Sequence, residues 1–218
     1  MSNRDRWTFT HAIGAACDSV IRLIVSALAL SRIHPNVLTF IGLLVNGVAA
    51  ALLASGRFFT AGLVIIAAGL FDMVDGRVAR ETNRVTRFGG FFDSVLDRYS
   101  DLVLLMGLLV YYASINRFFY VVLTAVVMTG SVMVSYTRAR AECTIPLCKV
   151  GFMERPERLV LFIIGAIFNR MAQVLWIIAL LANLTVIQRI LHTWKETRRL
   201  EAPEKRQVRE VAANGRPR

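Results

Sequence analysis

Long apolar runs alternate with short polar or basic segments along this chain of 218 residues. A helix that crosses the hydrocarbon layer of a membrane, about 30 Å thick, needs about 20 predominantly apolar residues. Six runs approach or reach that length, and they predict helices over residues 37–54, 58–71, 91–112, 118–136, 159–168 and 172–191. The pattern therefore predicts an all-α integral membrane protein with six transmembrane helices in one domain, residues 35–194.

Two of the six runs are too short to cross a membrane unaided. Residues 58–71 form only about 21 Å of helix at a rise of about 1.5 Å per residue, so this helix must continue through Asp72, Asp75 and Gly76. The run at 159–168 must likewise begin earlier, near Arg155. Charged groups at membrane depth face a water-filled cavity or one another, because lipid cannot solvate them. The sequence thus predicts a polar cavity inside the bundle, open to one side.

The two flanks differ from the central domain. In residues 15–33, Asp18, Arg22 and Ser26 recur every four residues against an apolar face. This spacing predicts an amphipathic helix that lies in the membrane interface, so residues 1–34 are expected to form a cytoplasmic, interfacial segment. Residues 195–218 are polar and basic, and they predict a frayed cytoplasmic tail that rests on anionic headgroups.

The composition agrees with a membrane protein. Hydrophobic residues make up 56% of the chain and charged residues 19%, against about 45–50% and about 25% in soluble domains. A formal net charge of +11 would suit a nucleic-acid-binding or a disordered protein, yet the long apolar runs exclude both classes. The three cysteines form no metal-binding pattern.

The basic residues collect on one side of the predicted membrane helices. With six spans, all but three of the 26 Lys and Arg fall in the flanks or near the connections that follow the second and fourth spans. The opposite side holds only Arg57, Arg117 and Arg170. Because positively charged loops stay in the cytoplasm, both termini and the polar cavity are expected on the cytoplasmic side of the cell membrane. With an odd number of spans, the basic residues would no longer collect on one side of the membrane.

Four aspartates mark the predicted cavity. Asp72 and Asp75 share one helix face at a spacing of three residues, and Asp93 and Asp97 share another at a spacing of four. Carboxylates so placed repel one another unless cations lie between them. Their oxygens suit Mg²⁺ or Mn²⁺, and two such ions can hold a pyrophosphate and stabilise charge on its bridging oxygen. The alternative is a set of helix-end acids paired with neighbouring arginines, which their membrane depth disfavours.

A longer motif contains these acids. It reads D-x-x-D-G-x-x-A-R from Asp72 to Arg80, and eight residues later G-x-x-x-D-x-x-x-D from Gly89 to Asp97. The motif resembles the signature of the CDP-alcohol phosphotransferase family, as do the six spans and the Pro-Asn-x-x-Thr sequence at residues 35–39. The resemblance extends over nearly the whole chain except the tail after about Lys195. It implies transfer of a phosphatidyl-type group from a CDP-linked lipid to an alcohol, with release of CMP.

The resemblance also implies a role for each acid. Asp72, Asp75 and Asp93 would hold the metal ions, and Asp97 would contact one ion and take the proton from the acceptor alcohol. A metal-bound hydroxyl loses its proton more easily, so a carboxylate beside it can act as a base. Asp101, one helical turn beyond Asp97, either orders the site from outside the metal ligands or pairs with an arginine.

The same resemblance implies a binding site for the CDP-lipid. The residues expected to hold it are Asn36, Thr39, Gly76, Arg80 and Thr86. Elementary chemistry agrees for two of them, because Gly76 leaves room for a ligand against the backbone and Arg80 offers a fork of donors to phosphate. Some related enzymes carry an acid where this chain has Asn36, which leaves the orientation of the acceptor hydroxyls open.

A second group of basic residues predicts the kind of acceptor. Arg138 and Arg140 close the fourth span, and Arg155 and Arg158 open the fifth. Several arginines at membrane depth form an anion pocket suited to a phosphate, so the acceptor is expected to carry a phosphate itself. The alternative is that these arginines only contact anionic headgroups and fix the topology.

Two segments narrow the acceptor further. Residues 135–142 (SYTRARAE) and 151–158 (GFMERPER), with Arg189 in the sixth span, resemble phosphatidylinositol phosphate synthases and their archaeal-lipid counterparts. This resemblance implies a homodimer and an inositol 1-phosphate acceptor. The residues expected to bind its phosphate are Arg138, Arg155 and Arg189, supported by Ser135, Arg140 and Arg158.

Two other functions stay open. A phosphatidylglycerophosphate synthase would use the same chemistry with glycerol 3-phosphate as its acceptor. A small cation transporter would use the four acids as an ion path, but transporters often contain internal repeats, and the acid motif has no second copy in the latter half of the chain.

Overall fold

The computed structural model describes the backbone of residues 35–81 and 86–214, and the side chains of residues 36–70, 72 and 86–202. These residues form six helices and no strand: α2 (Pro35–Ala54), α3 (Phe58–Glu81), α4 (Arg87–Ser114), α5 (Phe118–Ala141), α6 (Arg155–Ile167) and α7 (Met171–Asn214). The all-α prediction is confirmed. The amphipathic helix predicted within residues 1–34 lies outside the described residues.

Two helix bounds agree with the predictions made from membrane thickness, and the end of α7 differs from the predicted frayed tail. α3 continues beyond its apolar part to Glu81, and α6 begins at Arg155 with Pro156 in its first turn, where a missing N–H leaves no hydrogen bond unmade. The tail does not fray at residue 195, because α7 continues to Asn214. Its Glu, Lys, Arg and Ala residues are strong helix formers, so a polar composition does not end the helix.

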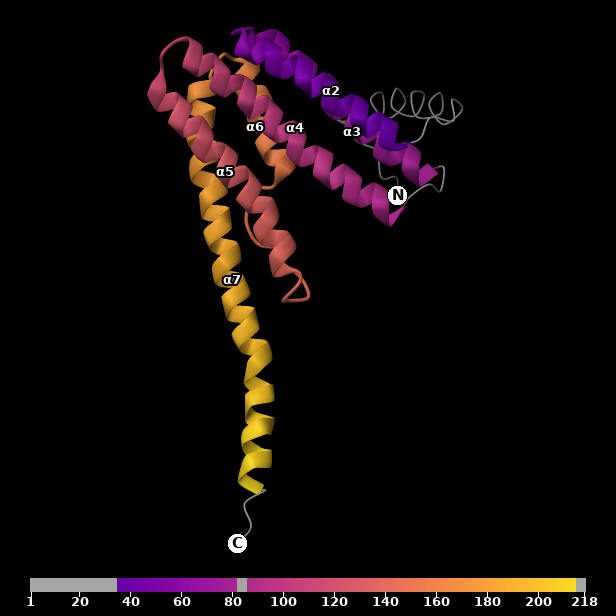
Figure 1. The fold of residues 1–218 in the computed structure, drawn as a ribbon, viewed down its shortest axis with the longest axis vertical. Helices are drawn as coiled ribbons and strands as arrows, with labels where there is room; N and C mark the ends of the chain where they lie inside the picture. Colours follow the sequence, from indigo (N-terminus) through magenta and orange to yellow (C-terminus); the bar gives the residue numbers. More distant parts are fainter. Residues whose placement is uncertain (1–34, 82–85, 215–218) are drawn as a thin grey trace, which may run out of the picture.

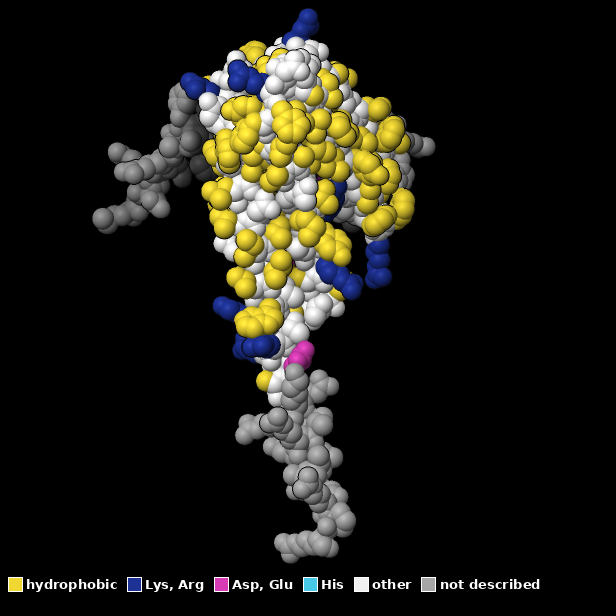
Figure 2. Space-filling view, turned by 60° about the vertical axis from the view of Figure 1, so that its left-hand side comes forward, with side chains coloured by type: hydrophobic (Ala, Val, Ile, Leu, Met, Phe, Trp, Pro, Cys, Tyr) yellow, Lys and Arg dark blue, Asp and Glu magenta, His cyan; other side chains and the backbone are white. Residues whose placement is uncertain are grey.

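The outside of the bundle is apolar. Among the described helices, three are long and apolar enough by themselves to cross a membrane, namely α2, α5 and α7, whereas α3 has a shorter apolar part at Phe58–Leu70. Phe119, Trp176 and Leu180 are each more than half exposed. Figure 2 shows hydrophobic side chains spread over the bundle, with Lys and Arg above and below them. Such a large exposed apolar surface indicates a membrane protein.

Three tight turns join consecutive helices at one end of the bundle (Figure 1). Each turn contains one residue with a positive φ, 73° at Gly56, 55° at Asn116 and 52° at Asn169. An arginine follows, and its backbone N–H donates to the carbonyl five residues earlier, at 2.9 Å for Arg57, 2.9 Å for Arg117 and 2.7 Å for Arg170. Gly and Asn adopt this left-handed conformation at low cost, so these short polar segments end their helices. We call this end of the molecule the turn end.

The helices pack in a closed ring in the order α2, α3, α6, α7, α5, α4, so that each contacts two neighbours. All six contribute buried apolar side chains to the core. α2 and α4 approach closely at Gly107, where a Cβ would collide with the carbonyl oxygen of Ala50. In Figure 1, α2, α3 and α4 run away from the turn end in one direction, and α5 and α7 run in another. We call the end where these helices diverge the site end.

Candidate active site

Three carboxylates converge at the site end. Asp72 of α3 and Asp93 and Asp97 of α4 each bring one oxygen within 4.8 Å of the others, and all three residues are partly buried. Asp75 lies one turn after Asp72 in α3, and its side chain lies outside the described residues. A compact set of carboxylate oxygens is the donor set that a hard divalent cation prefers. The residues present therefore fit such an ion.

The starts of α2 and α4 meet beside this carboxylate cluster. Thr86 caps α4, and its Oγ1 accepts a hydrogen bond of 2.9 Å from the N–H of Gly89. A Cβ on Gly89 would lie 3.0 Å from that oxygen and 3.5 Å from Oδ1 of Asn36. Glycine at this position therefore lets two predicted CDP-lipid contacts, Thr86 and Asn36, lie close together.

The remaining predicted CDP-lipid contacts lie in α2 and α3. Thr39, one turn after Asn36, lines a cavity of about 10 Å³ that Asp72 and Asp97 also line. Gly76 and Arg80 belong to the part of α3 whose side chains are outside the described residues. Among the described members of the predicted lipid site, Thr39 thus borders the carboxylate cluster, whereas Asn36 and Thr86 lie beside Gly89, one turn before Asp93.

Arg155, the first residue of α6, lies among the carboxylates. Its Nη1 is 2.9 Å from Oδ2 of Asp72, its Nη2 is 3.0 Å from Oδ1 of Asp97, and its Nε is 3.7 Å from Oδ1 of Asp101. One guanidinium therefore links α3, α4 and α6 and offsets part of the repulsion among the acids. Its contact with Asp101 is longer than a hydrogen bond, so the attraction there is electrostatic.

A cavity of about 270 Å³ opens beside Arg155, between α4, α5, α6 and α7. Predicted phosphate contacts that line it are Ser135, Arg138, Arg155 and Arg189. Oε1 of Glu154 also lies there, 2.9 Å from Nη1 of Arg138 and 3.1 Å from Nη2 of Arg189. The cavity, which we call the arginine cavity, thus offers strong donors for a phosphate and a carboxylate acceptor for hydroxyl groups.

Arg98, which was not among the predicted site residues, also lines the arginine cavity. Arg98 directly follows Asp97, and its Nη1 donates to the carbonyl of Ser94 in the preceding turn of α4. In the sequence analysis, Arg98 counted only as one of the basic residues expected on the cytoplasmic side. The signal that would have identified it is its position inside the span predicted at residues 91–112, because a charged residue within a span is a functional candidate.

Arg189 forms a buried wall of the arginine cavity, since only 1% of it is exposed. Its Nε donates to the carbonyl of Val150 at 2.9 Å, and its Nη1 donates to the carbonyl of Val134. α7 is therefore tied both to the last turns of α5 and to the connection over residues 142–154. Gly151 permits this approach, because its φ is 99° and a Cβ would collide with Thr185.

Two predicted phosphate contacts, Arg140 and Arg158, point elsewhere. Arg140 is exposed and lines a separate groove between α5 and α7, because residues two apart on a helix face different directions and Arg138 takes the inner one. Arg158 is buried, and its Nη2 lies 2.7 Å from Oδ2 of Asp101. The arginines were grouped by their nearness to one membrane face, and nearness along the chain does not fix the direction of a side chain.

Known proteins are similar to this chain over most of its length. The profile of the CDP-alcohol phosphatidyltransferase family matches residues 32–196, which include every described residue of the site. An archaetidylinositol phosphate synthase of Pyrococcus horikoshii is 37% identical over 180 residues, 80% of this chain and 89% of the relative. A phosphatidylinositol phosphate synthase of Mycobacteroides abscessus is 34% identical over 177 residues, 77% of this chain and 80% of the relative.

Solved structures share the fold as well. The phosphatidylinositol phosphate synthase of Mycobacterium tuberculosis with CDP-DAG bound superimposes with a TM-score of 0.75 at 30% identity, covering 81% of this chain and 94% of that one. Its complex with manganese and citrate gives a TM-score of 0.75 at 32% identity, covering 80% and 88%. Sequence, fold and carboxylate cluster agree, and the chain belongs to the CDP-alcohol phosphatidyltransferase family of enzymes.

Proposed function

We propose that this enzyme transfers a phosphatidyl-type group from a CDP-linked lipid to inositol 1-phosphate, releasing CMP. The observation that carries the proposal is the position of Arg155, which contacts the carboxylates of Asp72 and Asp97 and also lines the arginine cavity. A reaction between a pyrophosphate held by cations and a phosphorylated alcohol needs a cation site and a phosphate site side by side, and Arg155 joins the two. The names of the two relatives described above support an inositol phosphate product.

The carboxylate cluster is the proposed site of two divalent cations, Mg²⁺ or Mn²⁺. The proposed ligands are Asp72, Asp75, Asp93 and Asp97. When bound, the ions would neutralise the pyrophosphate and the charge that develops on the departing phosphate. Asn36, Thr39, Gly76, Arg80 and Thr86 are the proposed contacts of the nucleotide. The Mycobacterium tuberculosis relative, solved with manganese and with CDP-DAG, supports both assignments.

Asp97 is the proposed general base. The hydroxyl of the acceptor gives its proton to the Asp97 carboxylate, and its oxygen forms a bond to the lipid-side phosphorus. The bond from that phosphorus to the bridging oxygen breaks, and the electron pair leaves with CMP. Asp97 suits this role because it contacts Arg155 and directly precedes Arg98, and both arginines line the arginine cavity.

The arginine cavity is the proposed acceptor site. Ser135, Arg138, Arg155 and Arg189 are positioned to donate to a phosphate, and the carboxylates of Glu142 and Glu154 line the same cavity. A cyclic polyol phosphate uses both kinds of group, since its phosphate requires donors and its many hydroxyls require acceptors. Glycerol 3-phosphate has fewer hydroxyls and would donate to fewer of these carboxylate oxygens.

We also infer that all six described helices cross the cell membrane, the 13-residue α6 together with the connection that precedes it, and that both termini and the arginine cavity lie on the cytoplasmic side. Residues 1–34 would lie in the interface and residues 195–218 in the cytoplasm. The charge distribution supports this orientation, because the three connections at the turn end contain only three basic residues, Arg57, Arg117 and Arg170. In a cysteine-free background, Arg57→Cys should react with an impermeant maleimide in intact cells, and Arg140→Cys only after lysis. The reverse pattern would refute the orientation.

We also propose that the enzyme is a homodimer. Chemical crosslinking in native membranes tests this, because a dimer should give a crosslinked band at twice the mass of the chain.

A panel of acceptors tests the reaction itself. Detergent-purified protein receives CDP-diacylglycerol labelled in the cytidine, Mg²⁺, and either inositol 1-phosphate, glycerol 3-phosphate or free inositol. We expect CMP release only with inositol 1-phosphate, and none with the Asp97→Asn variant. Release with glycerol 3-phosphate instead would favour the phosphatidylglycerophosphate synthase. If none of the three alcohols causes release of CMP, the proposed transfer reaction is wrong, and the cation transporter becomes the alternative to test.

A further inference from the structure

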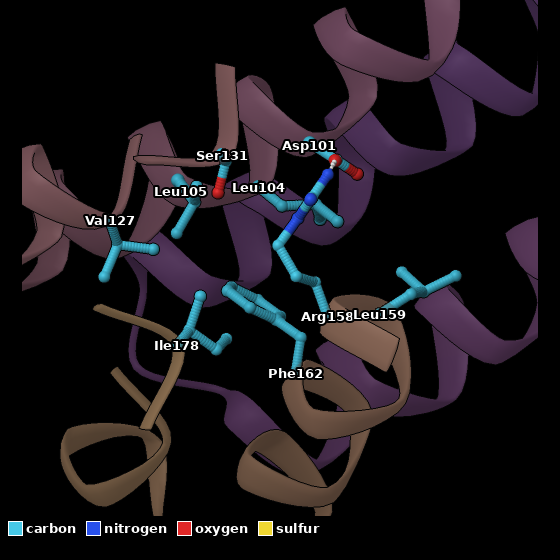
Figure 3. Close-up of a pocket in the computed structure, with 9 residues that line it drawn as sticks. All are labelled: Asp101, Leu104, Leu105, Val127, Ser131, Arg158, Leu159, Phe162 and Ile178. Atoms are coloured by element: carbon cyan, nitrogen blue, oxygen red, sulfur yellow. Dashed lines mark hydrogen bonds and ion pairs between the residues drawn. The ribbon is translucent and has the colours of Figure 1, made fainter. Parts of the chain in front are cut away.

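A second polar cluster lies next to the candidate active site, on the side that faces the turn end. The proposed reaction does not use it. Figure 3 shows a small cavity, about 20 Å³ in volume, between α4, α5, α6 and α7. Its polar residues are Asp101, Ser131 and Arg158, and aliphatic and phenylalanine side chains form the rest of its wall. Asp101 lies one helical turn beyond Asp97, so this cavity begins where the carboxylate cluster ends.

Two polar groups at this cavity have no hydrogen-bond partner among the described residues. They are Nη1 of Arg158 and Oγ of Ser131, in residues that are only 6% and 4% exposed. Buried polar groups are nearly always hydrogen-bonded, either to protein or to ordered water. One water needs about 10–15 Å³ and at least two polar partners, and this cavity provides about 20 Å³. A water here would accept from Nη1 of Arg158 and donate to Oγ of Ser131.

The other edge of the Arg158 guanidinium holds Asp101, as Figure 3 shows. Nη2 of Arg158 donates to Oδ2 of Asp101 at 2.7 Å, and Oδ1 of the same carboxylate faces Nε of Arg155 at 3.7 Å. Arg158 of α6 and Asp101 of α4 thus lead to Arg155, and a water between Ser131 of α5 and Arg158 would extend this chain of polar groups to α5. This chain ends at the residue that joins the carboxylate cluster to the arginine cavity.

We propose that Arg158 is a positioning residue, which together with Asp101 and a buried water bound to Ser131 holds Arg155 at the mouth of the arginine cavity. The inference rests on the proposed function, in which Asp72 and Asp97 bind cations. Those cations would compete with Arg155 for the same carboxylates and repel its charge. Asp101 then remains as the acid that attracts Arg155, and the hydrogen bond from Arg158 fixes the direction of that acid.

The KM for inositol 1-phosphate, measured at saturating CDP-lipid, tests the positioning role. Arg158→Met keeps much of the side-chain volume and should raise this KM about tenfold with little change in kcat. Arg158→Lys keeps the charge and should restore part of the loss. In an Arg155→Ala background, Arg158→Met should add less than about twofold, because the residue that it positions is absent. An unchanged KM in Arg158→Met, or fully additive effects in the double variant, would overturn the role.

The water is tested with Ser131→Ala and a matched control, Thr124→Val. Thr124 is a fully buried hydroxyl two turns earlier on α5, and it already donates to the carbonyl of Tyr120 at 2.7 Å. Ser131→Ala should raise the KM about twofold to threefold by loosening Arg158, whereas Thr124→Val should not change it. A high-resolution structure should show one water bonded to Arg158 and Ser131. A dry cavity, or equal effects of the two substitutions, would overturn this part of the inference.

Thermal unfolding without substrates separates failure of this inference from failure of the proposed function. If the wild-type protein releases no CMP with inositol 1-phosphate, the proposed function is wrong. The pair of Arg158 and Asp101 is still testable then, because Asp101→Asn should cost less stability in the Arg158→Met background than it costs in the wild type. Additive losses would overturn the chain. Should Arg158→Met fail to fold, Arg158→Lys and Ser131→Ala carry the same test.

Discussion

The two ends of the helix bundle are held together in different ways. At the turn end, each connection closes through backbone hydrogen bonds around one residue of positive φ. At the site end, ion pairs that centre on Arg155 and Arg158 join helices distant in sequence. Backbone turns tolerate most side-chain changes, whereas removal of one member of a partly buried ion pair leaves its partner uncompensated. Substitutions at the site end should therefore alter catalysis, and substitutions at the turn end should alter stability alone.

The largest effect is expected for Asp97→Asn at the site end. The amide keeps the shape of the carboxylate but cannot accept the proton, so CMP release should fall by about 10²–10⁴-fold or more. Binding of the CDP-lipid and the thermal midpoint should stay close to wild type, because one negative charge leaves a crowded group of acids. Labelled CDP-lipid gives both the rate and the binding. Substantial turnover in this variant would remove the general-base assignment.

Removal of divalent ions should also abolish activity. Treatment with EDTA should stop CMP release, and Mg²⁺ or Mn²⁺ should restore it. An ion that binds only the folded protein raises its thermal midpoint, so the midpoint of the wild type should rise with Mg²⁺. That of Asp93→Asn should rise less, because it lacks one carboxylate of the cluster. An equal rise in both proteins would place the ion elsewhere.

The next effect in size is on acceptor binding. Arg155→Ala should raise the KM for inositol 1-phosphate about tenfold or more, since a charge-assisted contact to the phosphate is lost. Arg140→Ala is the matched control, because Arg140 lines a separate groove outside the arginine cavity, and its KM should stay within about twofold of wild type. Equal changes in the two variants would show that general positive charge, and not the arginine cavity, attracts the acceptor.

The smallest effects are expected at the turn end. Gly56 has a φ of 73°, and a Cβ there would lie 2.9 Å from Cε2 of Tyr111. Gly56→Ala should therefore destabilise the protein by about 1 kcal/mol, measured as a lower thermal midpoint in detergent, with kcat and KM unchanged. Asn116→Gly should change the stability by less than about 0.5 kcal/mol, because both residues accept a positive φ. A loss of catalysis without a loss of stability in Gly56→Ala would contradict the independence of the two ends.

The sequence predicted those features that depend on distances along one helix. Membrane thickness required α3 to continue past Phe71 and α6 to begin at Arg155, and both do. The spacing of Asp93 and Asp97 placed both carboxylates on one face of α4, and both lie in the cluster with Asp72. The breaks between three pairs of predicted helices also coincide with the three turns of the turn end. Each of these features follows from local geometry.

Features that depend on how distant helices pack were not predictable in the same way. Pairing with an arginine was one of the two roles expected for Asp101, but the sequence did not identify its partner, Arg158, which lies 57 residues away and was expected to contact phosphate. The folded connection over residues 142–154 is similar, because it depends on a close approach between Gly151 and Thr185. α7 continues into the tail for another reason: Glu, Lys and Arg are polar residues and also good helix formers.

The close approach of Gly107 to Ala50 has a consequence for how such enzymes change their substrates. It joins α2 to α4, so the proposed nucleotide contacts and the acids of α4 form one frame, with α3 packed against it. The arginine cavity draws Ser135, Arg138 and Arg189 from α5 and α7, together with residues at the start of α6. In the proposed assignment, the residues for donor chemistry thus occupy one contiguous half of the gene and most residues for acceptor recognition occupy the other. Recombination near codon 116 should therefore exchange acceptors between related enzymes while the donor machinery is inherited intact.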